Sequence, residues 1–320
     1  MKYLKILIFF KYLVFFIKAA KVTDGVFFVF YGPTYDDYKI TTLNFNFATL
    51  INTKYYNSNK PTVFYVHGWR SGIKMVGTED IVQAYLSRGD HNIIAVDWSK
   101  YSSNVDYIEV AASVKNQATF NTAVLRQMQT AGFNLSTFHF VGHSLGAQIL
   151  GRVGYQFINN YSFKFKRITG LDPAGPLFAN RNVDKLFQLE YPTLNKLNAE
   201  FVDIIHTDAG TFGSKYSTGH IDFRPNGGSS QYGCSLSDCL QINQDDCLSC
   251  DHGRAWKYYA ESVNITTSTF IAKRCPDNVT DFTKSKCIGP ETASMGFNAD
   301  KYKVGGNYYL ETNDRKLYSK

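Results

Sequence analysis

The sequence predicts an α/β fold with a mostly parallel central sheet, and three observations support this prediction. Short apolar runs alternate along the chain with segments of helical periodicity. The strand interiors are apolar, which is typical of a sheet that helices cover on both faces. Polar residues gather directly after several of the expected strands, where parallel sheets hold their sites.

The first half of the chain supplies three expected strands and two expected helices. The apolar runs at 61–69, "PTVFYVHGW", and at 91–99, "HNIIAVDWS", predict buried strands. Apolar residues between Val105 and Gly132 recur at the spacing of an amphipathic helix. The run "STFHFVG" at 136–142 predicts the next strand, and a turn and a helix from Leu145 to about Phe157 follow it.

The second half supplies two further strands that end in polar residues. "FKRITGLDPAGP" predicts a strand that ends at Asp172, and "AEFVDIIHTDAG" predicts one that ends at His206. The tail from Ser268 alternates weakly, and we expect a few outer strands there. No repeat or low-complexity linker divides the chain, so residues 21–320 are expected to form a single domain.

The start of the chain predicts export. Residues 1–20, "MKYLKILIFFKYLVFFIKAA", have a basic start, an apolar middle and small residues at the end, which is typical of a secretory signal peptide. A membrane anchor is the alternative, but the apolar stretch is short and Lys11 interrupts it. Four of the seven excess positive charges are lysines of this segment, so the remaining charge is too small and dispersed to suggest nucleic-acid binding.

The six cysteines are even in number and cluster in the last third of the chain, which favours disulfides in an exported protein. They are Cys234, Cys239, Cys247, Cys250, Cys275 and Cys287. Zinc is the alternative because Cys247 and Cys250 form a C-x-x-C, but no second such pair accompanies it. Four glycosylation sequons are compatible with a secreted glycoprotein, at Asn134, Asn160, Asn264 and Asn278.

The segment "FHFVGHSLGAQILG" places Ser144 in a G-x-S-x-G pattern between an expected strand and an expected helix. A serine in this context sits in a sharp turn and acts as a nucleophile, and side chains at the two glycine positions would collide with the backbone. The positive end of the following helix would stabilise a developing oxyanion. A structural serine is the alternative.

A nucleophilic serine needs a histidine as base and an acid that orients the histidine. His252 is the best candidate base, because a cysteine precedes it closely and it begins a helix-like segment. His206 and His220 are the other histidines that follow in the required order. Asp172, 28 residues after the serine at a strand end, is the best candidate acid.

The alternative acids and the donors of the oxyanion hole lie at further positions of the sequence. Asp203 and Asp208, one strand later, are the alternative acids. The oxyanion hole needs two backbone N–H donors, and Leu145 supplies one directly after the nucleophile. Trp69, at the end of "HGW", is expected to supply the other.

Six ordered segments resemble the pancreatic lipase family of animal α/β-hydrolases, over roughly residues 26–265 with a fainter match beyond. The segments are "FYVHGW", "VGHSLGAQILG", "ITGLDPAGP", "FVDIIHTDAG", "GHIDFRPNGG" and "CDHGRAWKYY". The resemblance implies a triad of Ser144, Asp172 and His252, favours Asp172 over Asp203, and implies oxyanion donors at Trp69 and Leu145. It also implies an α/β-hydrolase fold and a secreted enzyme that hydrolyses lipid esters at a lipid–water interface.

Within this family, the short loops of this chain resemble those of phospholipases A1 such as the wasp venom enzymes. These enzymes cleave the sn-1 acyl ester of phospholipids. The family's lid lies between the cysteines that align with Cys234 and Cys250, and here it has only 15 residues. The resemblance therefore implies the pairs Cys234–Cys250, Cys239–Cys247 and Cys275–Cys287. A triacylglycerol or galactolipid lipase is the alternative, and a non-catalytic lipid-binding or yolk-type storage protein is the alternative of another class.

Two departures from the family pattern shape the remaining expectations. The larger lipases carry a C-terminal β-sandwich, for which the chain is too short, so we expect neither that domain nor a protein cofactor. Thr193, Asn195 and Asn198 stand where the lipases have an Arg and two Asp. A hard cation prefers carboxylates, so we expect no calcium site, no other metal and no cofactor.

Overall fold

The computed structural model describes residues 25–42, 44–51, 53–178, 193–239, 249–264, 270–277, 281–299 and 305–320. The expected signal peptide over residues 1–20 lies outside this part of the chain. Within the described residues, no helix is both long and apolar enough to cross a membrane.

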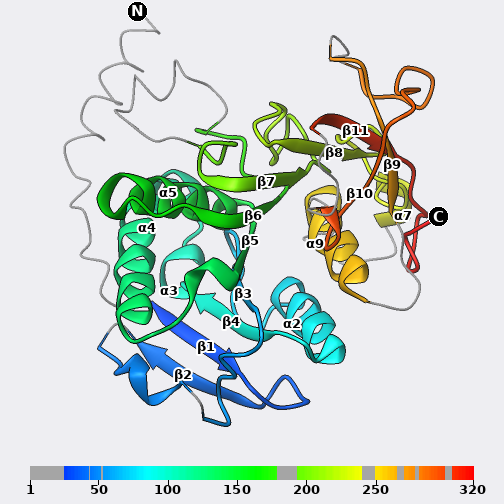
Figure 1. Ribbon diagram of the computed structural model, residues 1–320. Coiled ribbons are helices and arrows are strands. Elements are labelled where there is room, and N and C mark those ends of the chain that lie inside the picture. Colours follow the sequence, from blue (N-terminus) through cyan, green and yellow to red (C-terminus); the bar gives the residue numbers. More distant parts are fainter. Residues whose placement is uncertain are drawn as a thin grey trace, which may run out of the picture.

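Eleven strands of the described chain join in one sheet, in the order β10-β9-β11-β8-β7-β6-β5-β3-β4-β1-β2 (Figure 1). They are β1 (Val26–Phe30), β2 (Tyr38–Thr42), β3 (Thr62–Val66), β4 (Asn92–Asp97), β5 (Phe138–His143), β6 (Phe165–Leu171), β7 (Ala199–Ile205), β8 (Ile221–Pro225), β9 (Ile271–Arg274), β10 (Thr292–Ser294) and β11 (Gly306–Leu310). The strands from β4 to β11 in this order pair in parallel, and both edges of the sheet are antiparallel.

Helices cover both faces of the sheet (Figure 1). They are α2 (Val76–Arg88), α3 (Ser99–Ser102), α4 (Tyr107–Thr130), α5 (Leu145–Tyr161), α7 (Leu236–Cys239) and α9 (Cys250–Val263), with short 3₁₀ turns at Phe47–Thr49 and Leu135–Thr137. The apolar sides of α4 and α5 share one core with β3 and β5, whereas α2 and α9 pack together in a second core on the other face. This arrangement explains why the central strands are apolar on both sides, as in the fully buried β3.

The predicted fold class is confirmed, and the expected strands and helices are present with shifts of a few residues. The helix after Ser144 continues to Tyr161, four residues beyond the expected end, and the rings of Phe157 and Tyr161 lie 5.3 Å apart at its last turn. The expected outer strands after Ser268 are β9, β10 and β11. The strands β1, β2 and β8 and the helix α2 were not predicted.

Two disulfides link the described cysteines. Cys234 pairs with Cys250, and Cys275 pairs with Cys287. These are two of the three pairs that the resemblance implies. The third pair, Cys239–Cys247, lies outside the described residues, because the side chain of Cys239 and all of Cys247 fall there.

Candidate active site

Ser144 occupies a strained turn between β5 and α5. Its backbone has φ 55° and ψ −121°, a conformation that L-residues adopt only when their surroundings impose it. The Ser144 N–H donates to the carbonyl of Leu171 at the end of β6, at 3.0 Å, which fixes the turn to the neighbouring strand. The side chain is 6% exposed, at the carboxyl ends of the parallel strands.

The two flanking glycines leave room for this turn. A Cβ on Gly142 would lie 2.7 Å from the backbone of Ala147, and one on Gly146 would lie 2.1 Å from the carbonyl oxygen of Val66. Either distance is far shorter than a non-bonded contact between heavy atoms, so larger residues would push the turn apart. The spacing of glycines around the serine therefore has the steric basis that the sequence suggested.

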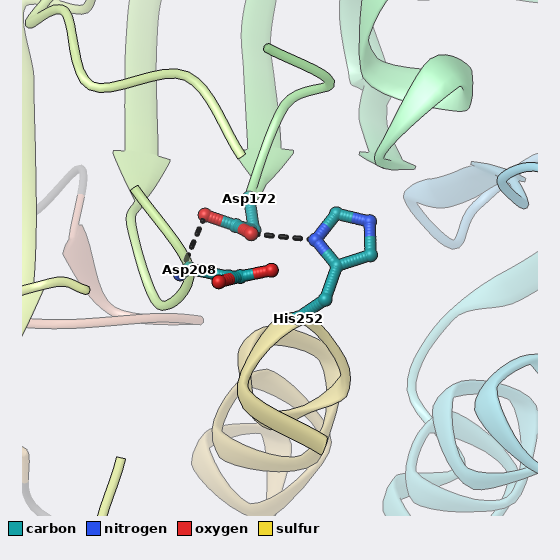
Figure 2. Close-up of side chains that lie close together, drawn as sticks. All are labelled: Asp172, Asp208 and His252. Carbon is teal, nitrogen blue, oxygen red and sulfur yellow. Dashed lines mark hydrogen bonds and ion pairs between the residues drawn. The ribbon is translucent and has the colours of Figure 1, made fainter. Parts of the chain in front are cut away.

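His252 and Asp172 form a close pair next to this turn. Nδ1 of His252 and Oδ2 of Asp172 are 2.6 Å apart, and Figure 2 shows the imidazole reaching the carboxylate from the start of α9. The other carboxylate oxygen accepts the N–H groups of Thr207 at 2.9 Å and Asp208 at 3.2 Å. Donors of this kind stabilise the ionised carboxylate, which can then hold Nδ1 of His252 protonated.

The alternative candidates have other partners. Asp203 forms a buried two-point ion pair with Arg167, at 2.9 and 3.0 Å, and also accepts from Thr169. His206 is fully buried between the carboxylate of Asp222 and the carbonyl of Ser214. His220 accepts the N–H of Val202 through Nδ1, which anchors a strand. These contacts are those of structural residues.

Asp208, the remaining alternative acid, lies beside the His252–Asp172 pair (Figure 2). Burial and the neighbouring Asp172 carboxylate raise the pKa of Asp208 to about 6. Ligand atoms of Asp172, Asp208 and His252 lie within 4.8 Å of one another, a geometry that could hold a metal ion. The Asp172 oxygens already accept three N–H donors, so hydrogen bonding accounts for the arrangement without a metal.

The loop at Thr193 to Asn198 uses its amide side chains to bind its own backbone. Oδ1 of Asn198 accepts the N–H of Asn195 at 2.8 Å, and Oδ1 of Asn195 accepts the N–H of Leu197 at 2.9 Å. These oxygens stand where the resemblance would place calcium ligands. That the chain binds no calcium stays a prediction.

His143, inside the G-x-S-x-G pattern, is a site residue that the sequence did not single out. Nε2 of His143 is 3.2 Å from the carbonyl oxygen of His252, and the two rings are 4.5 Å apart. Burial and the neighbouring His252 hold the pKa of His143 well below its usual value, so its ring is neutral at physiological pH. Among the described residues no hydrogen bond joins Ser144 to His252, and His143, the chain neighbour of Ser144, contacts His252.

Trp69 and Leu145 place two backbone N–H groups at the turn. A Cβ on Gly68 would lie 2.7 Å from Cβ of Ser144, so the backbone leading into Trp69 passes directly against the serine. Leu145 is the first residue of α5, where N–H groups have no partner within the helix. No acceptor among the described residues binds either N–H group.

The contacts around Trp69 and His252 fix the backbone on both sides of the turn. Nε1 of Trp69 donates to the carbonyl of Asn104 at 2.7 Å. Cys250, the first residue of α9, is bound to Cys234, and Arg254 one turn later donates to the carbonyl of Tyr232. Hydrogen bonds and a disulfide from neighbouring segments therefore hold the backbone that carries the serine turn, the two N–H groups and the His–Asp pair.

Comparison with known proteins identifies the family. The family model described as Lipase matches residues 17–318. Lipase member H-A of Xenopus laevis is 36% identical over 255 residues, which cover 78% of this chain and 52% of that protein. Pancreatic triacylglycerol lipase of Oryctolagus cuniculus is 30% identical over 295 residues, covering 85% of this chain and 60% of that protein.

The chain spans about half the length of the curated relatives it matches. A solved structure of Bacillus licheniformis lipase BlEst2 matches 50% of this chain at 13% identity, with a TM-score of 0.34, which is too low to carry an argument. The family match covers nearly the whole chain, and the strained serine turn stands at the expected strand end. The chain therefore belongs to the lipase family of α/β-hydrolases that includes the pancreatic lipases.

Proposed function

We propose that this protein is a serine carboxylic-ester hydrolase that acts on lipids through an acyl-enzyme. The observation that carries the proposal is the His252–Asp172 pair beside a serine held in a strained turn. A serine at such a turn presents its oxygen outward, and a carboxylate-bound imidazole is the base that it needs.

In the first half of the proposed reaction, Oγ of Ser144 attacks the carbonyl carbon of the ester. Nε2 of His252 takes the serine proton, and the Asp172 carboxylate stabilises the imidazolium. The N–H groups of Trp69 and Leu145 hold the oxyanion of the tetrahedral intermediate. The intermediate collapses when His252 returns the proton to the leaving alcohol, which breaks the ester C–O bond.

In the second half, water replaces the alcohol. His252 takes a proton from the water, whose oxygen attacks the acyl carbon bound to Ser144. The second tetrahedral intermediate releases the fatty acid and restores the serine hydroxyl with the proton from His252. The start of α5 points its positive end toward both intermediates and favours them electrostatically.

Phospholipase A1 activity is the finer proposal for the substrate. The Cys234–Cys250 disulfide closes a segment with a sequence separation of only 16, and the segment from Asp208 to Gly219 is also short. Short segments in these two places would leave room for a phospholipid head group, whereas a long lid would enclose an apolar cleft. Triacylglycerol hydrolysis is the second candidate, because a relative of 30% identity is a pancreatic triacylglycerol lipase.

Export from the cell is part of the proposal. Disulfides persist in oxidising compartments, and the two disulfides of the described residues support an extracellular protein. The substrate would then be lipid at an interface outside the cell.

An acyl-release assay tests this proposal. The purified protein and its Ser144→Ala variant are incubated with phosphatidylcholine labelled at sn-1 or at sn-2, and with triolein. We expect release of the sn-1 label alone and none from Ser144→Ala. Release from triolein alone would replace the phospholipase proposal with a triacylglycerol lipase, and release by Ser144→Ala would refute the mechanism.

A further inference from the structure

Gln231 is a buried residue whose side chain uses its whole hydrogen-bonding capacity. It is 5% exposed and lies in the segment between β8 and α7. Its Nε2 donates to the carbonyl oxygens of Thr207, at 2.9 Å, and Pro225, at 3.1 Å. Its Oε1 accepts from Nδ2 of Asn226, at 3.0 Å, and from the hydroxyl of Tyr258, at 3.1 Å. An amide side chain has two N–H donors and two acceptor positions, so these four bonds fill its capacity.

One of these bonds leads directly to the acid of the His252–Asp172 pair. The carbonyl of Thr207 and the N–H of Asp208 belong to the same peptide unit, and this N–H donates to Oδ1 of Asp172 at 3.2 Å. A trans peptide unit is planar, so a bond that fixes the carbonyl also fixes the direction of the N–H. A hydrogen bond on the carbonyl polarises the unit as well, which strengthens its N–H as a donor. Gln231 therefore acts on Asp172 through one rigid group.

The Thr207 carbonyl depends on Gln231 more than the other three partners do. Each of those three has a second hydrogen bond, which Asn226 and Tyr258 make with Thr312 and Pro225 makes with Gly228. Within the described chain, Nε2 of Gln231 is the single donor to the carbonyl of the fully buried Thr207. A buried carbonyl without a donor costs free energy. Loss of the Gln231 side chain should therefore move this peptide unit.

Gln231 also binds the helix that carries the base of the pair. Its backbone N–H donates to Oδ1 of Asp251, which directly precedes His252 in the first turn of α9. Tyr258, which donates to the side chain of Gln231, lies further along the same helix. Asp172 and His252 are 80 residues apart in the chain and meet where the segment of Asp208 faces the start of α9 (Figure 2). Gln231 thus joins the two segments that hold the acid and the base.

Gln156 of α5 gives the comparison for a glutamine that only joins helices. Its side chain accepts the hydroxyl of Thr122 at 2.7 Å and donates to the hydroxyl of Thr119 at 3.2 Å. Both partners lie in the middle of α4, so this bridge fixes α5 against α4. The contacts of Gln231 differ, because they end on the peptide unit that binds Asp172 and on the residue before His252.

We propose that Gln231 is a positioning residue that fixes the geometry of the His252–Asp172 pair. Its side chain aims the Asp208 N–H at the carboxylate, and its backbone fixes the start of α9. The imidazole then meets the carboxylate at 2.6 Å. Gln231 acts through Asp172 and not on the ester itself. Its effect on rate rests on the proposed function, whereas its effect on the pair does not.

A double-mutant cycle on Gln231 and Asp172 tests this role. Gln231→Met removes the four side-chain bonds at nearly constant volume and keeps the backbone bond to Asp251. Gln231→Asn is a milder second variant, because its amide is shorter by about 1.5 Å and no longer reaches the Thr207 carbonyl. Gln156→Met is the matched control.

Each substitution is made in the parent protein and in Asp172→Asn protein. Kinetics are measured on soluble 4-nitrophenyl butyrate, with Ser144→Ala protein as the background, and thermal unfolding checks that each variant is folded. We expect Gln231→Met to lower kcat about tenfold with little change in KM, because a shift below 1 Å costs less than the roughly 10²-fold loss of a 1 Å misplacement. Gln231→Asn should show a smaller loss of the same kind.

The Asp172→Asn background separates positioning from general damage to the fold. There, Gln231→Met should change kcat by less than about twofold, because its effect passes through the carboxylate, which that protein lacks. Gln156→Met should lower the unfolding temperature but keep the parental kcat. The proposal is overturned by parental kcat in both Gln231 variants, by an equal loss in the Asp172→Asn background, or by an equal loss in Gln156→Met.

NMR of the Nδ1 proton of His252 tests the pair without any assay of activity. Histidine is isotope-labelled, and the signal is identified by its loss or shift in Asp172→Asn protein. We expect the signal to shift in Gln231→Met and to stay in place in Gln156→Met, and a parental signal in Gln231→Met would overturn the proposal. A signal that responds to Gln231 in a parent protein without ester hydrolysis would refute the proposed function and leave the positioning role standing.

Discussion

Gly213 lies so close to Asp172 that one added methyl group tests the role of the carboxylate. A Cβ on Gly213 would lie 2.3 Å from Oδ1 and 2.4 Å from Oδ2 of Asp172. Non-bonded heavy atoms prefer separations of roughly 3.5 Å, so the carboxylate or the loop must move by about 1 Å. The contact between His252 and Asp172, now 2.6 Å, would stretch beyond hydrogen-bonding distance.

The expected effect of Gly213→Ala is a loss of rate rather than of substrate affinity. A misplacement of about 1 Å in an orienting group can cost about 10²-fold in rate. We expect kcat on a soluble ester to fall by about this factor with little change in KM, because Asp172 does not touch the ester. Steady-state kinetics measure both constants, and thermal unfolding checks that the variant is folded.

Gly210→Ala is the matched control in the same loop. Gly210 has φ +98° and nothing lies within 4 Å of its added Cβ, so alanine strains the backbone without touching Asp172. We expect it to lose about 1 kcal/mol of unfolding free energy but no activity. A Gly213→Ala variant with parental kcat, or a Gly210→Ala variant equally impaired, would refute the orienting role of Asp172.

Three further predictions concern the pKa of Asp208, a buried ion pair and the disulfides. Asp208 has a pKa of about 6 in the native state, whereas an aspartate of the unfolded chain has a pKa of about 4. Between pH 4 and pH 6 the native state therefore binds more protons than the unfolded state, and its stability falls as the pH rises. Asp208→Asn should therefore gain stability relative to the parent over that range in urea titrations, and an unchanged difference would contradict the raised pKa. Asp203→Asn leaves Arg167 without its buried carboxylate and should lower the free energy of unfolding in urea by about 3–5 kcal/mol. A loss below 1 kcal/mol would argue against the pair as a structural element. The two disulfides of the described residues close loops of similar length, with separations of 16 and 12, so removing either should cost about 3 kcal/mol of unfolding free energy. Only the loss of Cys234–Cys250, which anchors the start of α9, should lower kcat.

The central strands and the serine turn could be predicted because their signals are local. A buried parallel strand such as β3 is apolar along its whole length, and the turn after β5 needs glycines at fixed offsets. Chain order and strand ends gave candidates for the histidine and the acid, and the family resemblance favoured Asp172 over Asp203. The strands and the turn each depend on a few consecutive residues.

Features that depend on contacts distant in sequence could not be predicted. The strand β2 has a mixed pattern with one buried residue, because it lies at the edge of the sheet and pairs with β1 alone. The contact of His143 with His252 joins residues 109 apart, at the end of β5 and the start of α9. In the same way, the close approach of Gly213 to Asp172 depends on how the segment after β7 folds over β6. Spacing along the chain carries no signal for such contacts.

Covalent labelling tests most directly the central claim, that Ser144 is the nucleophile of an ester hydrolase. The protein is treated with a serine-directed phosphonate, digested and analysed by peptide mass spectrometry, while hydrolysis of a soluble ester is followed in the same sample. We expect one adduct, on Ser144, that forms in step with the loss of activity and is absent from Ser144→Ala. An active protein without an adduct on Ser144, or a labelled Ser144 with undiminished hydrolysis, would contradict the proposed mechanism.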